Sequence, residues 1–219
     1  NSTRLFIAIE AARKLDQDDR ADRLRETLIT EAEQVNPPVT LISLAQRFED
    51  KALYRDAEES YLYLKQKYPG QRAHVYDRLT HVYRALGDTK ALQTLSNDMM
   101  LLDPENPIYR HNWAYLSFLR GEALTEVKSV LQSLVEAYHL APSVCALALL
   151  AHENGDNATA QALIGPLAWE ELSPLDQRIA RLISPSLGMP KELRLTLLPE
   201  EERRIHAKLT YHQAASAVE

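Results

Sequence analysis

The chain has 219 residues, a formal net charge of −6 and 45% hydrophobic residues. This hydrophobic content allows a folded core and excludes a disordered chain, while the negative charge counts against sequence-independent nucleic-acid binding. The six glycines argue against an all-β fold, because tight hairpin turns use glycine.

The N-terminal region 1–37 is predicted to be a helix pair that is less regular than the rest of the chain. Residues 5–15 and 19–35 have helical patterns, and Pro37 and Pro38 end the pair. Apolar residues share one face of the second helix: Leu24, Leu28, Ala32 and Val35. We interpret this region as an atypical first repeat or a cap.

A nearly constant spacing recurs through the middle of the chain. The leading motif of each unit begins at Leu44, Leu79, Trp113 and Leu147. The turn glycines recur with the same spacing, at Gly87, Gly121 and Gly155, and prolines close the units at Pro69, Pro104 and Pro142. This period predicts repeats over 38–71, 72–105, 106–140 and 141–172.

Each unit is predicted to be two helices joined by a tight turn. In the first unit one face of the second helix carries Tyr54, Ala57, Tyr61, Leu64 and Tyr68. We expect close helix approaches at the small residues Ala45, Ala57, Ala114, Ala148 and Ala160, with larger neighbours at Phe48, Tyr61, Tyr83, Leu95 and Ile164. Each turn glycine can adopt the left-handed backbone conformation that ends a helix. The acidic residue after it can stabilise the start of the next helix by capping it or through the helix dipole.

This pattern resembles the tetratricopeptide repeat (TPR), with its ordered W-x2-L-G-x2-Y…A-x3-F…P positions, over roughly residues 38–174. Units 38–70 and 141–172 match best, whereas unit 106–140 lacks the alanine and the proline. The resemblance implies an all-α fold, a right-handed α-solenoid of about five antiparallel helix pairs with C-terminal capping helices. The alternative is a HEAT or armadillo solenoid, whose units are longer.

The region 173–219 is predicted to hold capping helices and a tail. Residues 174–183 form a helix after a Ser173 N-cap, residues 184–190 break the chain, and residues 193–198 alternate weakly. Residues 199–202 begin a last helix with an acidic first turn. We expect this helix either to cap the last apolar face or to lead to a part of the protein outside these 219 residues. The longest apolar run, 143–151, is far shorter than the roughly 20 residues of a membrane span.

No catalytic, cofactor or metal motif stands out in the sequence. There is no glycine-rich phosphate loop and no HExxH, and His152-Glu153 lacks a second histidine at the required spacing. The single cysteine, Cys145, excludes an intrachain disulfide and lies in an apolar run, where we expect a packed structural thiol. We therefore predict no enzyme activity and no cofactor.

One helix face is the leading candidate for a binding surface. His74, Asp77, His81 and Arg84 share it, opposite Val75, Leu79, Val82 and Leu86. The resemblance implies that first helices line a concave groove, which adds Gln46, Glu49, His111, Tyr115, Phe118 and His152. Three interpretations are open: a solvated polar groove, a groove that binds a partner segment, and a metal or pH-sensing cluster.

One known TPR use is a clamp on acidic C-terminal peptides, made by Lys, Asn and Arg on three consecutive first helices. Asn112 fits an Asn position of that kind. The preceding helix instead offers Asp77 and His81, and the next offers Pro142 and Ala146. The clamp is therefore absent, which disfavours an Hsp70/Hsp90 co-chaperone.

The helix 108–119 is apolar almost all round, so we expect more than one of its faces to be buried. It packs against the following helix, or else Tyr115 and Phe118 form an exposed apolar patch in the groove.

The function predicted is a non-catalytic scaffold that binds a partner protein or peptide in the groove, with no nucleic acid and no membrane insertion. Two alternatives stay open: a regulatory or docking segment of a larger multidomain enzyme or bacterial envelope assembly protein, and a self-associating homo-oligomer without a peptide ligand. Both the cytoplasm and the bacterial periplasm fit the single thiol. The start at Asn1 rather than Met is consistent with excision from a longer protein.

Overall fold

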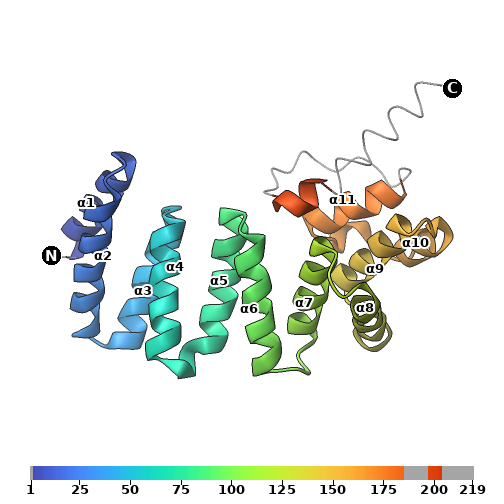
Figure 1. Ribbon diagram of the computed structural model, residues 1–219, viewed down its shortest axis with the longest axis horizontal. Helices are drawn as coiled ribbons and strands as arrows, with labels where there is room; N and C mark the ends of the chain where they lie inside the picture. The colour runs from blue at the N-terminus through green and yellow to red at the C-terminus, as the bar shows by residue number, and fades with distance from the viewer. Residues whose placement is uncertain (1, 185–196, 204–219) are drawn as a thin grey trace. The chain divides into compact units, whose positions relative to one another are not determined.

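The computed structural model describes residues 2–184 and 197–203, and every regular element in these ranges is a helix. The chain divides into two compact units, residues 1–86 and 87–219. This division falls inside the predicted unit 72–105, between its two helices. Within each unit consecutive α-helices pack on one another, in agreement with the predicted all-α fold (Figure 1).

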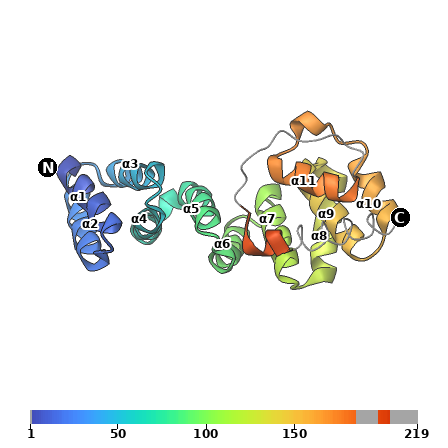
Figure 2. The ribbon, with the colours of Figure 1, turned by 90° about the horizontal axis from the view of Figure 1, so that it is seen from above.

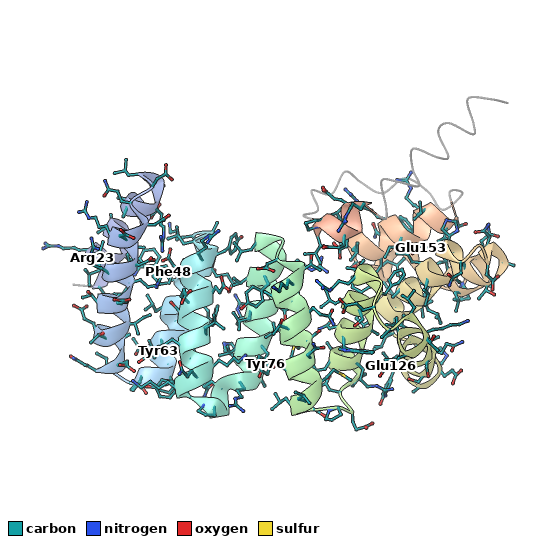
Figure 3. The ribbon with its side chains drawn as sticks, viewed as in Figure 1. Arg23, Phe48, Tyr63, Tyr76, Glu126 and Glu153 are labelled. Atoms are coloured by element: carbon teal, nitrogen blue, oxygen red, sulfur yellow. The ribbon has the colours of Figure 1, made fainter. Side chains whose placement is uncertain are left out.

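The first unit is a row of five helices in which each packs on the next (Figure 1). Its core is filled by large side chains, among them Phe48, which Figure 3 labels. The rings of Phe6 and Phe48 stack at 4.9 Å between centroids. The helices are α1 (Ser2–Lys14), α2 (Asp18–Glu33), α3 (Pro37–Asp50), α4 (Tyr54–Lys67) and α5 (Arg72–Leu86).

In the second unit α6 packs on α7, α7 on α8, α8 on α9 and α9 on α10. The helix α11 lies against α9, as Figure 2 shows. Every residue from Ser143 to Leu150 of α9 is buried, so this helix is the centre of the unit. The helices are α6 (Thr89–Leu102), α7 (Pro107–Arg120), α8 (Leu124–Tyr138), α9 (Ala141–Glu153), α10 (Asn157–Ile164) and α11 (Pro174–Ile183); residues 199–203 are also helical.

The alternation of small and large residues predicted from the repeat is confirmed. All five small alanines are completely buried, and the five larger neighbours are buried as well. An alanine at such a position lets two helix axes approach closely, and the neighbouring large side chain fills the space beside it. Val35 is an exception to the predicted faces: α2 ends at Glu33, so Val35 lies beyond the helix and is 68% exposed.

The turn chemistry is confirmed in part. The three turn glycines have positive φ values of 68°, 74° and 82°, the left-handed region that ends a helix. Asp88 and Asp156 cap α6 and α10 by accepting hydrogen bonds from the amides of Ala91 and Thr159. Glu122 does not cap α8, which begins at Leu124; its carboxylate instead accepts from Arg120 at 2.7 Å. Ser173 caps α11 as predicted.

A buried ionic cluster joins the first helix pair to the second, a feature that the repeat pattern did not predict. Asp56 of α4 is 1% exposed, and Arg13 of α1 donates to both its carboxylate oxygens, at 3.0 and 2.7 Å. Arg25 of α2 donates to the same carboxylate at 3.0 Å, and both arginines also bind Asp22. Asp56 therefore joins three helices.

The predicted last helix is present over 199–203 but does not cap the last apolar face. The helix α11 lies against α9 and α10, whereas residues 197–203 contact α6 and α7. The predicted break over 184–190 and the alternation over 193–198 fall mainly outside the described residues, as does the tail beyond residue 203.

Candidate functional site

The helix α5 is amphipathic, as the sequence indicates. Val75, Leu79 and Val82 are fully buried, while Leu86, at the helix end, is 37% exposed. On the other side of the helix His74, Asp77 and His81 are exposed and Arg84 is partly exposed. This face of the first unit presents charged and imidazole groups to solvent.

On α3 the two predicted groove residues differ in their surroundings. Gln46 is partly exposed and has no role in the core. Glu49 is tied to its neighbours: Arg78 of α5 forms an ion pair with it at 2.7 Å, and the hydroxyl of Tyr61 donates to it at 3.1 Å. Burial raises the pKa of Tyr61 to about 12, so the phenol stays protonated and donates. Glu49 thus links three helices of the first unit.

On α7 the predicted residues are largely covered. Phe118 is 1% exposed and Tyr115 is 7% exposed, so neither forms an exposed apolar patch. The ring of His111 stacks on Tyr115 at 5.9 Å and shares a hydrogen bond of 3.0 Å with the hydroxyl of Ser143 on α9. Burial lowers the pKa of His111 to about 4, which keeps this imidazole neutral at physiological pH.

The face of α7 that carries Tyr115 holds another part of the chain, residues 197–203. The hydroxyl of Tyr115 donates to Glu201 Oε1 at 3.0 Å, and Glu201 is 1% exposed. Thr89, the first residue of α6, donates its hydroxyl to Glu200. Leu198 is fully buried. Figure 2 shows the short helix 199–203 beside α6 and α7.

The repeat register relates the covered face to the exposed one. Asp77 and His81 of α5 precede His111 and Tyr115 of α7 by one repeat length each, so they occupy the same two repeat positions. On α5 both side chains are exposed, whereas on α7 the tyrosine lies under residues 197–203. Equivalent positions therefore face solvent in one unit and a polypeptide segment in the other.

The remaining predicted residue, His152, lies at the end of α9, far along the chain from this face. Its Nδ1 lies 2.6 Å from the side-chain oxygen of Asn157, across the turn to α10. It therefore belongs to the α9–α10 turn rather than to the contact at Tyr115.

The sequence interpretation missed Thr89, Leu198 and Glu201 as members of this contact. One local signal was available, because Leu198, Pro199 and Glu201 fit the start of a helix. The amide of Leu198 donates to Glu201 Oε2 at 2.8 Å, the bond that a glutamate at the third helical position makes with the N-cap. That signal predicts the helix start but not the surface it meets.

Metal ligands and the single thiol are two further candidates for chemistry. Within 2–184 and 197–203, His, Cys, Asp and Glu form no group of three that could hold a metal ion. Cys145 is fully buried, and burial raises the pKa of its thiol well above the ordinary range, as expected for a packed structural cysteine. Across the same ranges, no helix combines the length and apolar character needed to cross a membrane.

No family model matches the sequence, and no curated protein matches it. Among solved structures, the chain is similar to a thermophilic TPR protein from Thermus thermophilus, at 17% sequence identity and a TM-score of 0.47, over 96% of this chain and 100% of that chain. A likeness this distant carries no argument about function. The fold rests on the helices themselves: an all-α chain with a regular sequence repeat, whose helix pairs resemble those of tetratricopeptide repeats.

Proposed function

We propose that this protein is a non-catalytic interaction protein that binds a segment of a partner protein on the first-helix faces of its repeats. The observation that supports this most directly is the contact between α7 and residues 197–203. There one repeat face holds a polypeptide segment through a hydrogen bond from Tyr115, and Leu198 of that segment is fully buried.

In the first unit we assign partner binding to the exposed face of α5. Asp77 and His81 occupy the repeat positions of His111 and Tyr115, and both are exposed. A carboxylate and an imidazole four residues apart can accept and donate hydrogen bonds to a partner's backbone or side chains. His74 and Arg84 extend the same face, and Gln46 adds an amide from α3. Glu49, which is held by Arg78, positions α5 rather than contacting the partner.

The test is capture of partners from a lysate of the native organism, read by mass spectrometry. The parent chain is compared with a variant carrying Asp77→Lys and His81→Ala, and with a control carrying Glu59→Lys on α4. Glu59 is also exposed, so the control makes the same charge change away from the proposed face.

We expect a partner that the parent and the control capture and that the double variant loses, with circular dichroism showing equal helix content in all three. Equal capture by the double variant would remove the α5 face as the binding site. A parent that captures no partner would contradict the proposed function.

A further inference from the structure

The surface that receives residues 197–203, here called the α6–α7 seat, consists of Gly87, Thr89, Tyr115, Leu119 and Arg120. Tyr115 and Thr89 donate their hydroxyls to Glu201 and Glu200. Pro199 lies close to Gly87, with its Cδ 3.8 Å from the position that a Cβ would take. Leu119 and Arg120 line a hollow of about 360 Å³ together with Glu200 and Arg203.

The seat binds carboxylates of the segment. Two side-chain hydrogen bonds from the seat to the segment run from a hydroxyl donor to a carboxylate oxygen. Hydrogen bonds to an ionised acceptor are roughly twice as strong as those between neutral groups. Thr89 is also the first residue of α6, and the positive end of a helix dipole favours an acid beside it. Two consecutive glutamates match these donors.

The bound segment is folded by its own contacts. Glu201 accepts from the amide of Leu198 at 2.8 Å, and the amide of Glu202 donates to the carbonyl of Leu198 at 3.0 Å. These bonds make a self-contained helix start. The two carboxylates bond to the seat, and Leu198 of the same segment is fully buried. Any chain that begins a helix with a leucine, a proline and two glutamates can present the same groups.

We propose that the α6–α7 seat is a binding site for a partner protein's acidic helix start, a leucine followed within the first helical turn by two glutamates, and that residues 197–203 occupy it in the partner's absence. This rests on the proposed function, that the protein binds segments of other proteins, and adds the chemistry of the partner. Residues 197–203 are tethered to the seat and therefore compete with a partner at a high effective concentration. A partner must bind the seat more tightly than residues 197–203 do, or their own binding must first be weakened.

The experiment uses the full chain and one defined probe, a fluorescent peptide of residues 197–203, Leu-Leu-Pro-Glu-Glu-Glu-Arg, with binding read by fluorescence anisotropy. An opened variant carries Leu198→Ala and Glu201→Ala, which weaken only the chain's own segment. Tyr115→Phe is then added to remove one donor of the seat while keeping the ring that stacks on His111. Tyr138→Phe, on the half-exposed Tyr138 of α8, is the matched control.

We expect the opened variant to bind the peptide at least about tenfold more tightly than the parent, because the competing segment has been weakened. Adding Tyr115→Phe then weakens binding by roughly tenfold, the loss typical of a hydrogen bond to a charged group, while Tyr138→Phe has no effect. A peptide with glutamines at both seat positions binds the opened variant at least about tenfold more weakly.

Three results would overturn the proposal. The opened variant could bind the peptide no better than the parent while keeping the parent's helix content by circular dichroism. Tyr115→Phe could leave binding unchanged. Sedimentation could show that the parent pairs with a second copy through exchanged 197–203 segments, which would make that copy the occupant. The lysate capture depends on Asp77 and His81 and the peptide assay on Tyr115, so the two proposals can fail separately.

Discussion

The two compact units hold their helices together by different chemistry. In the first unit the buried carboxylate of Asp56 joins α1, α2 and α4 through Arg13 and Arg25, at 2.7 to 3.0 Å. In the second unit the central helix α9 is buried from Ser143 to Leu150, and a hydrogen bond between Ser143 and His111 connects it to α7.

This difference predicts different weaknesses in the two units. A buried carboxylate between two arginines is stable while all three groups are present, but removing the carboxylate leaves the two positive charges close together with weaker compensation. A buried apolar helix depends on volume, because protein interiors are packed to the density of crystals. The first unit should therefore be sensitive to loss of charge, and the second to changes of size and to the charging of its buried histidine.

The largest effect is expected from Asp56→Ala in the first unit. The change leaves Arg13 and Arg25 with the partly exposed Asp22 as their shared carboxylate, and we expect a loss of about 3 kcal/mol of stability, the lower end of the range for broken buried pairs. Hydrogen exchange read by mass spectrometry should show faster exchange in α1 to α4, with α8 to α10 unchanged. The exposed Asp19→Ala is the control. Equal exchange in parent and variant would mean that the cluster does not hold the unit together.

A smaller effect is expected from Ala148→Leu in the second unit. Ala148 is completely buried where α9 meets its neighbours, and the added methylenes must displace packed side chains. Overpacking of this kind costs about 1–3 kcal/mol. The change should lower the denaturant midpoint of the second unit and leave the first unchanged, whereas Ala162→Leu, on the exposed side of α10, should change neither. An unchanged midpoint for Ala148→Leu would show that the alanine is not at a close helix approach.

Acidification should weaken the second unit before the first. Burial lowers the pKa of His111 from its ordinary 6.5 to about 4, so between these pH values the unfolded chain binds a proton that the folded chain does not. Stability contributed by the neutral imidazole is therefore lost as pH falls from about 6.5 to about 4, by about 1–3 kcal/mol.

Asp22 of the first unit behaves differently. Burial alone would raise the pKa of its carboxyl, but hydrogen bonds and charge from Arg13 and Arg25 outweigh burial and lower it. Its contribution to stability is lost only as pH falls below the ordinary pKa of aspartate, about 3.9. Urea titrations at pH 7 and pH 5 test this order, and His111→Gln should remove the pH dependence of the second unit. A first unit that weakens earlier would contradict the assignment.

The features that the sequence predicted correctly are those set by short-range patterns. The alanines at helix crossings, the three left-handed glycines and the Ser173 cap each depend on neighbours within about one helical turn or on the repeat itself. The helix pairs follow from the same patterns.

The features that the sequence did not predict join distant parts of the chain. Arg13 and Asp56 are 43 residues apart, Tyr115 and Glu201 are 86 apart, and Thr89 and Glu200 are 111 apart. No periodicity identifies such partners. Tyr115 shows the consequence: its repeat position makes it a candidate groove residue, but a segment from far along the chain covers it.

The smallest effect is expected from Lys67→Ala, and it separates buried charge from surface charge within the same unit. Lys67 of α4 forms an ion pair with Glu33 of α2 and a hydrogen bond with Tyr63 (Figure 3). The lysine side chain is 48% exposed, so water and salt screen the pair, and each long side chain loses freedom by forming it. We expect no measurable change in the first unit's denaturant midpoint at physiological salt. A loss as large as that of Asp56→Ala would mean that charge alone, rather than burial of the charge, stabilises the first unit.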